Sequence, residues 1–500
     1  MARTDAVPAP SAAAPAAPPA NAGARATLSA LAWNYSAAVA GALLQLCYTG
    51  FTARVVAPRE FGAYAAAAAA LTVFGYVAGA GLSTYLLRAE VLTRGLVRTA
   101  YRAAFASGAL CFVATMLFAP TAATLWGMPE IEPVVQLFGC YFLTQPASLV
   151  ATAGLRRMGR ARAAALAETG AQFAGMAAGA VLLTAGWSPY GLVAASCLTP
   201  TVTLLVAAPL MARCVLPTGD RVTIPAVLGV SGAFALYGIL QMVTMDAALW
   251  AVARHLGPDA AGQFSRALLA VSLPASLLAQ ALRRAVMPAM AEVNGGGGSL
   301  RGVPTDVLNL GSALGCVSFG VLAGVGQPAL RLLLGPGWGA AGILVTVFAV
   351  CWPLMLLCQL GYAVDEVAKE LLVLFRVQLL VLAATSVLLT AAVAGTGSLV
   401  LTAAASPLAA GVGHVAQLVR WRRVGLCAPA TLVRPYLVHA ALGTALGVAG
   451  WVGVHSIDAG AELRLLTGLL AMVPVGLAAY AVRRWIPVYE AAVARGLVRR

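Results

Sequence analysis

Charged residues are scarce in this sequence. Only 10% of its 500 residues are Asp, Glu, Lys or Arg, whereas 61% are hydrophobic and the mean hydropathy is +0.88. A soluble domain typically carries about 25% charged residues. The composition therefore excludes a soluble globular protein and predicts an all-α polytopic membrane protein.

Side chains that bind metals are also few. The four histidines, His255, His414, His439 and His455, share no ligand spacing, and the nine cysteines lie mostly inside apolar runs. A cysteine in such a run behaves as a small hydrophobic side chain. We therefore expect neither a metal site nor a cofactor.

The first 27 residues lack the continuous apolar core of a cleavable signal peptide. They are mostly Ala and Pro, interrupted by Arg3, Asp5 and Arg25. A segment of this composition cannot bury enough apolar surface to fold by itself. It is predicted to be a disordered cytoplasmic tail.

Long apolar runs, by contrast, are abundant. We count fourteen, each near the roughly 20 residues that a helix needs to cross the hydrocarbon core. They predict two six-helix lobes, an additional C-terminal helix pair and a Gly-rich connector at about 283–306. The predicted boundaries are 28–212 for the N-terminal lobe, 213–224 for a cytoplasmic linker, 225–420 for the C-terminal lobe, 421–484 for the helix pair and 485–500 for a basic cytoplasmic tail.

The basic residues predict the orientation in the membrane. Lys and Arg are retained on the cytoplasmic side. If the N-terminus is inside, 26 of the 32 basic residues lie in cytoplasmic segments and five lie in outer loops. Both termini are then cytoplasmic. This asymmetry accounts for the net charge of +15, so we predict the lipid bilayer as a partner and no nucleic acid.

One short segment occurs twice. Arg54-Val-Val-Ala-Pro-Arg-Glu-Phe-Gly-Ala-Tyr64 returns as Arg254-His-Leu-Gly-Pro-Asp-Ala-Ala-Gly-Gln-Phe264, so Arg, Pro, Gly and an aromatic residue recur at a spacing of 200 residues. Each copy follows one apolar run and precedes another, which predicts a tight helical hairpin. Six helices separate the copies, so both enter the membrane from the same face. The lobes are therefore predicted to be parallel repeats.

The first copy also carries a family resemblance. The pattern "A-R-x-L-G-P-x-x-F-G-x-Y" is typical of bacterial polysaccharide transporters, and this sequence resembles that family. The matching residues are Ala53, Arg54, Pro58, Phe61, Gly62 and Tyr64, with Trp33 and Gln45 in the preceding span. Val56 and Ala57 depart from the pattern by replacing Leu and Gly.

The resemblance implies a function. The family belongs to the superfamily that also contains multidrug and toxin extrusion exporters, and its members flip a polyprenyl-diphosphate-linked oligosaccharide from the inner to the outer leaflet by alternating access. It implies a non-enzymatic flippase of the bacterial inner membrane that serves lipopolysaccharide or exopolysaccharide assembly. The implied partners are the lipid-linked oligosaccharide and other polysaccharide-assembly membrane proteins.

Two other functions remain open. A drug or metabolite exporter of the same superfamily is expected to have acidic residues deep in the N-terminal lobe, where this sequence offers at most Glu168. A membrane polysaccharide polymerase or glycosyltransferase generally needs catalytic groups on a sizeable outer loop, and the outer loops predicted here are short.

The candidate substrate-binding residues are Arg266, Asp246, Gln45, Gln241 and Arg54. Arg266 and Asp246 are predicted to lie roughly 6–8 Å inside neighbouring spans and to pair, either to handle an anionic head group or only to hold the hairpin. Gln45 and Gln241 can line a sugar path or join helices. Arg54, at an outer helix end, can bind substrate or anchor the helix at the interface.

Overall fold

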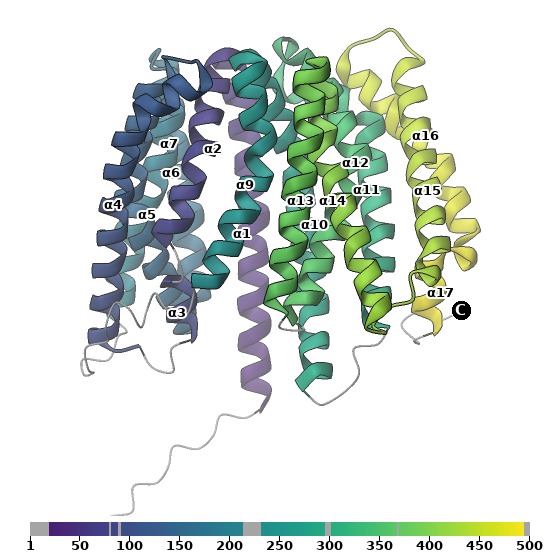
Figure 1. Ribbon diagram of the computed structural model, residues 1–500, viewed down its shortest axis with the longest axis horizontal. Coiled ribbons are helices and arrows are strands. Elements are labelled where there is room, and N and C mark those ends of the chain that lie inside the picture. Colours follow the sequence, from purple (N-terminus) through teal and green to yellow (C-terminus); the bar gives the residue numbers. More distant parts are fainter. Residues whose placement is uncertain are drawn as a thin grey trace, which may run out of the picture.

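The computed structural model describes residues 20–79, 82–88, 92–213, 232–295, 302–367 and 370–494. Every regular element of this part of the chain is a helix, and fourteen of the described helices are long and apolar enough to cross a membrane. Figure 1 shows two helical lobes side by side, with a further helix pair at the outer edge of the second lobe. The predicted fold class is confirmed.

The N-terminal lobe contains six long helices and one short one. Its pairs α4 and α5, and α6 and α7, pack along their lengths, and α1 packs against α6. The helices are α1 (Ala20–Val55), α2 (Pro58–Gly79), α3 (Leu82–Arg88), α4 (Arg94–Trp126), α5 (Ile131–Arg157), α6 (Ala161–Thr184) and α7 (Tyr190–Ala212).

The C-terminal lobe repeats this plan, and the helix pair follows it. The lobe consists of α9 (Gly232–His255), α10 (Gly257–Gly295), α11 (Val303–Leu334), η1 (Pro336–Trp338), α12 (Gly339–Val367), α13 (Leu371–Thr390), η2 (Ala391–Thr396) and α14 (Leu399–Arg423). The remaining elements are α15 (Ala430–His455), α16 (Ala461–Ala481), η3 (Arg483–Trp485) and α17 (Pro487–Ala494).

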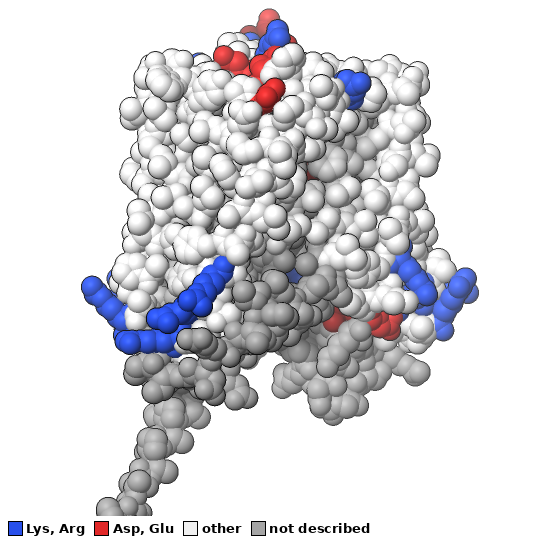
Figure 2. All heavy atoms as spheres, turned by 60° about the vertical axis from the view of Figure 1, so that its left-hand side comes forward, with Lys and Arg blue, Asp and Glu red and all other residues white. Residues whose placement is uncertain are grey.

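The two ends of the molecule differ. We call the end that carries the α1–α2 and α9–α10 turns the hairpin end, and the opposite end, where α1 begins, the basic end. On the face shown in Figure 2, a broad belt with hardly any charge separates charged side chains at the two ends. Large apolar side chains such as Leu117, Leu205 and Val387 are exposed within the candidate membrane spans. They are positioned to face lipid.

Glycine allows α15 to dock on the C-terminal lobe. Gly320 of α11 and Gly443 of α15 lie so close that a Cβ atom at Gly320 would be 2.3 Å from the Gly443 carbonyl oxygen. Gly324 and Gly447 continue the contact further along the same two helices. Small residues permit such close approach between membrane helices, where van der Waals packing and hydrogen bonds drive association.

Three segments that were predicted to lie outside the spans are partly helical. Helix α1 begins at Ala20, so residues 20–27 are helical, as the high helix propensity of Ala favours. Helix α10 continues to Gly295, so most of the predicted connector at 283–306 is helix. The predicted tail at 485–500 contains helix α17. Residues 1–19 and most of the predicted linker at 213–224 lie outside the described residues.

Candidate functional site

The lobes meet at the hairpin end, where α2 and α10 begin. A Cβ atom at Gly62 would lie 1.8 Å from the Pro258 carbonyl oxygen, and one at Gly262 would lie 2.0 Å from the Pro58 carbonyl oxygen. No side chain fits in either place. The two copies of the repeated segment therefore pack backbone against backbone, and each copy makes the same contact with the other.

Aromatic side chains surround this contact. Trp338 of η1, in the C-terminal lobe, is 3% exposed and donates its indole N–H to the Ala53 carbonyl oxygen of α1 at 2.8 Å. Phe61 of α2 meets Trp338 edge to face, with ring centroids 6.2 Å apart. We call the set Ala53, Pro58, Phe61, Gly62, Pro258, Gly262 and Trp338 the hairpin-end seal.

Arg266 lies immediately beneath the seal. Its side chain is 3% exposed, and its Nη2 donates to the Thr52 hydroxyl of α1 at 2.7 Å. The guanidinium carbon is 3.4 Å from the Phe61 ring centroid and 5.8 Å from that of Trp338. Such cation–π contacts favour a cation once it is removed from water. Arg266 of one lobe is thus held by Thr52 and Phe61 of the other.

The predicted pair of Arg266 and Asp246 is wrong. None of the ion pairs among the described residues joins Arg266 to a carboxylate. Asp246, on α9, instead faces Thr72 of α2 and lies near Tyr76. Both residues are nine positions from the hairpin end of their helices, about 13 Å along the axis and deeper than predicted. Their depths agree, but their helices turn them toward different neighbours.

Polar groups with unused hydrogen-bonding capacity lie around Arg266. The guanidinium Nε and the buried hydroxyls of Tyr48 and Thr49 have no partner among the described residues. Tyr48 and Tyr64 are close enough to Arg266 to interact with its charge, and the Tyr64 hydroxyl shares a hydrogen bond of 3.0 Å with Ser196. A buried donor without a partner costs free energy. This cluster therefore has spare capacity for an anionic group.

The other predicted residues are dispersed. Gln45 is part-buried on α1, three positions before Tyr48, whereas Arg54 is exposed at the hairpin end. Gln241 lines a cavity of about 20 Å³ inside the C-terminal lobe, where Gln378 donates to Thr244 at 2.8 Å. A cavity of this size holds about one water molecule and no sugar. Of the predicted residues, the structure therefore places Arg266 directly beneath the seal.

Thr52 and Trp338 are neighbours of Arg266 that were not predicted from the sequence. Thr52 directly precedes the motif, and Trp338 follows Gly335-Pro-Gly337 between two apolar runs. A tryptophan in a short outer loop of Gly and Pro was a usable signal. Phe61 belonged to the recognised motif, but its contact with Arg266 depends on how the lobes pack.

The start of α2 is tied to the rest of its own lobe. Arg59 donates to Glu130 of the α4–α5 loop at 2.9 Å, and Ser188 of the α6–α7 loop donates to Glu60 at 2.7 Å. The backbone hydrogen bond at Glu130, followed by the bond from Arg59, lowers the pKa of the Glu130 carboxyl. These contacts make the first copy of the motif move with the N-terminal lobe.

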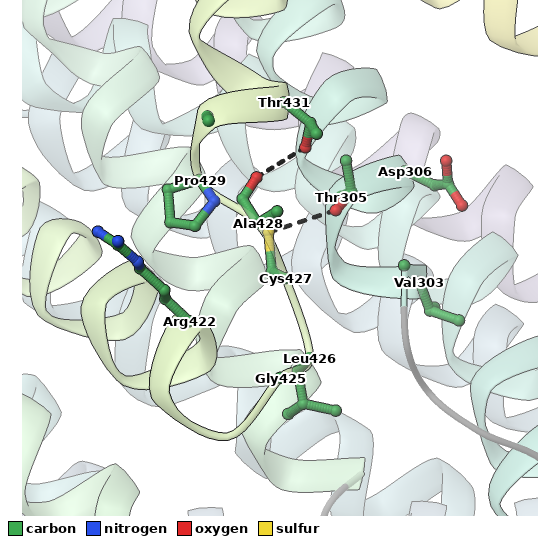
Figure 3. Close-up of a pocket in the computed structure, with 12 residues that line it drawn as sticks. Val303, Thr305, Asp306, Arg422, Gly425, Leu426, Cys427, Ala428, Pro429 and Thr431 are labelled. Carbon is green, nitrogen blue, oxygen red and sulfur yellow. Dashed lines mark hydrogen bonds between the residues drawn. The ribbon is translucent and has the colours of Figure 1, made fainter.

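A second cavity, drawn in Figure 3, opens at the basic end, where α14 ends (Figure 1). It has a volume of about 850 Å³ and lies between the start of α11 and the α14–α15 loop, with Arg422 and Asp306 on opposite sides. Thr305 and Cys427, which both line the cavity, share a hydrogen bond of 3.3 Å. Asp306 already places a negative charge at the N-terminus of α11. This cavity is therefore a weaker anion site than the region around Arg266.

Comparison with known proteins gives one family and one fold. Residues 51–342, more than half of the chain, match the family described as polysaccharide biosynthesis protein. No curated protein matches the chain in sequence. The fold is similar to that of the lipid II flippase MurJ in an inward closed conformation, with a TM-score of 0.72 and 11% identity over 94% of this chain and 100% of that one.

Transporters of the MOP superfamily share the fold less completely. A multidrug resistance MATE family transporter in an inward-facing conformation has a TM-score of 0.54 and 15% identity over 78% of this chain and 95% of that one. A MOP superfamily transporter from Pyrococcus furiosus has a TM-score of 0.50 and 14% identity over 79% of this chain and 95% of that one. At these identities the similarity establishes the fold alone.

Proposed function

The chain belongs to the polysaccharide biosynthesis protein family, and from this premise we propose that it is a membrane transporter that turns a polyprenyl-diphosphate-linked oligosaccharide from the inner to the outer leaflet. The family supports a role in polysaccharide assembly. The fold shared with a lipid II flippase supports a lipid-linked substrate. The repeated lobes support alternating access.

The observation that carries this proposal is the hairpin-end seal. It joins the two lobes through mutual contacts of Gly62 and Gly262, and it uses the same segment of each lobe. Small contacts of this kind break and reform without unfolding either lobe, as rigid-body motion requires. If both termini are cytoplasmic, the seal closes the outer side. The protein would then stand ready to receive substrate from the inner leaflet.

Arg266 is the proposed head-group residue. It is a buried cation, and the ion pairs of the described residues give it no carboxylate partner. Its planar guanidinium can form two parallel charge-assisted hydrogen bonds to a diphosphate. A diphosphate would supply the missing negative charge and acceptors for Nε. Gln45 is proposed to contact the part of the substrate that follows the diphosphate. Asp246 is proposed to lie at the interface between the lobes on the α9 side, where it faces Thr72 of α2.

Lipid analysis of a strain that lacks the protein tests this function. We expect the complete lipid-linked oligosaccharide to accumulate in the inner leaflet and surface glycan to fall, with both restored by the intact gene. Unchanged lipid-linked intermediates together with increased sensitivity to toxic compounds would identify a drug exporter instead. Surface glycan that persists as single repeat units would indicate a polymerase.

A further inference from the structure

Two arginines reach across the hairpin end in matching ways. Arg54, at the end of α1, donates through Nη2 to the Leu332 carbonyl oxygen in the last turn of α11 at 2.8 Å. Arg254, at the end of α9, lies against Gly127, which ends α4; its Nη1 would be 3.3 Å from a Cβ atom there. Each arginine lies in the last turn of the first helix of its lobe, α1 or α9. Each meets the end of the third long helix of the other lobe, α11 or α4.

The two receiving helix ends are built alike. Gly127 and Gly335 have φ values of 64° and 96°, a region that glycine enters without steric cost. Each glycine follows the last residue of its helix, where carbonyl groups lack partners within the helix and carry partial negative charge. Arg54 also passes over Gly335, with Cγ 3.9 Å from the position of a Cβ atom. Both ends therefore offer acceptors and space to a guanidinium.

We infer that Arg54 and Arg254 are a pair of clamps that hold the hairpin-end seal closed, each binding the C-terminal end of a helix in the opposite lobe. The inference rests on the proposed alternating access. Because both contacts join the two lobes at the same end of the molecule, a rigid-body opening of the lobes at that end breaks both together. Arg54 is thus a positioning residue of the seal rather than a substrate ligand.

The two clamps differ in strength. The Arg54 clamp contains a charge-assisted hydrogen bond, and this bond is weakened because it is exposed to solvent. Loss of Arg54 is therefore expected to lower the closed-to-open ratio about 3- to 10-fold. The Arg254 clamp depends on the attraction between the guanidinium charge and the C-terminal end of α4. Loss of Arg254 is therefore expected to lower the closed-to-open ratio about 2- to 5-fold. If both act on a single equilibrium, their effects multiply.

Cysteine labelling in the purified, substrate-free protein tests the pair. The nine native cysteines are replaced by alanine, and Thr52→Cys provides a probe, because Thr52 is fully buried and points across the interface at Arg266. When opening is rare and reclosing fast, the labelling rate by a hydrophilic maleimide is proportional to the open fraction. We expect Arg54→Gln and Arg254→Gln to raise the rate by the factors above, and the double variant by their product.

Two controls make the result decisive. Arg331→Gln removes an exposed arginine at the same end of the molecule, in the last turn of α11. It should leave the labelling rate unchanged. A probe at Thr203, buried inside the N-terminal lobe, should stay unlabelled in every variant, which excludes unfolding. A double variant that labels no faster than Arg331→Gln would overturn the clamp assignment. A wrong substrate assignment would leave these rates as expected and appear only in the lipid analysis.

Discussion

Gly62 and Gly262, 200 residues apart, each pack against the carbonyl oxygen of the proline in the other's motif. The first turns of α2 and α10 therefore touch without any side chain between them. Contacts between Cα–H groups and carbonyl oxygens recur at such helix crossings and contribute perhaps 0.5–1 kcal/mol each. A seal made of several weak contacts can open and close without the unfolding of either lobe.

Replacing Gly262 with alanine should open this seal. The new Cβ atom would lie 2.0 Å from the Pro58 carbonyl oxygen, so the two backbones must separate. We expect Gly262→Ala to insert normally, to increase labelling of a cysteine at Thr52 at least tenfold and to reduce glycan export strongly. Gly170→Ala is the matched control, because nothing lies within 4 Å of a Cβ atom there. Export that remains normal in Gly262→Ala would show that close contact is dispensable.

The sequence predicted the spans, their number and the repeat, because apolar length and motif spacing are local properties. It did not predict the partners of Arg266. Hydropathy places a residue at a depth but does not fix the direction in which its helix turns it, and here Asp246 turns toward Thr72. Thr52 and Phe61 meet Arg266 only because the lobes close on each other. That contact depends on tertiary packing between residues more than 200 positions apart, which no local pattern contains.

The C-terminal helix pair should detach when its glycine contact is filled. In Gly443→Leu the first side-chain carbon would lie 2.4 Å from the Cys316 carbonyl oxygen. Overpacking of this kind typically costs 1–3 kcal/mol. We expect a lower thermal midpoint and proteolytic cleavage near the α14–α15 loop. Gly476→Leu, on α16 where a Cβ atom meets nothing within 4 Å, should change neither measurement. Equal behaviour of the two variants would contradict the docking role of Gly443.

The orientation predicted from the basic residues can be measured with two single cysteines. Arg98 and Pro129 are exposed at opposite ends of the N-terminal lobe, near the start of α4 and just after its end. On intact cells an impermeant maleimide should label Pro129→Cys, and Arg98→Cys should react only after the membrane is opened. The reverse pattern would place the hairpin end in the cytoplasm. The seal would then close the inner side instead.

Substitutions at Arg266 and Thr52 separate a head-group residue from a purely structural one. Arg266→Ala removes the charge and the planar fork, whereas Arg266→Lys keeps the charge but loses the fork and most of the stacking on Phe61. If Arg266 binds the diphosphate, export should fall about 100-fold or more in Arg266→Ala and about 10-fold in Arg266→Lys, at normal membrane levels. This magnitude corresponds to losing one or two charge-assisted hydrogen bonds of about 1.5–3 kcal/mol each.

Thr52→Val is the matched control for this prediction. It removes the acceptor that holds Arg266 at 2.7 Å in the closed state and leaves the guanidinium in place. A head-group role predicts export within about threefold of the intact protein, because an anionic substrate replaces that acceptor. If Arg266 only stabilises the seal, Thr52→Val should impair export as severely as Arg266→Lys does. Export and membrane level of all three variants, measured by complementation of a deletion strain, decide between these roles. Full activity of an inserted Arg266→Ala variant would exclude Arg266 from substrate binding.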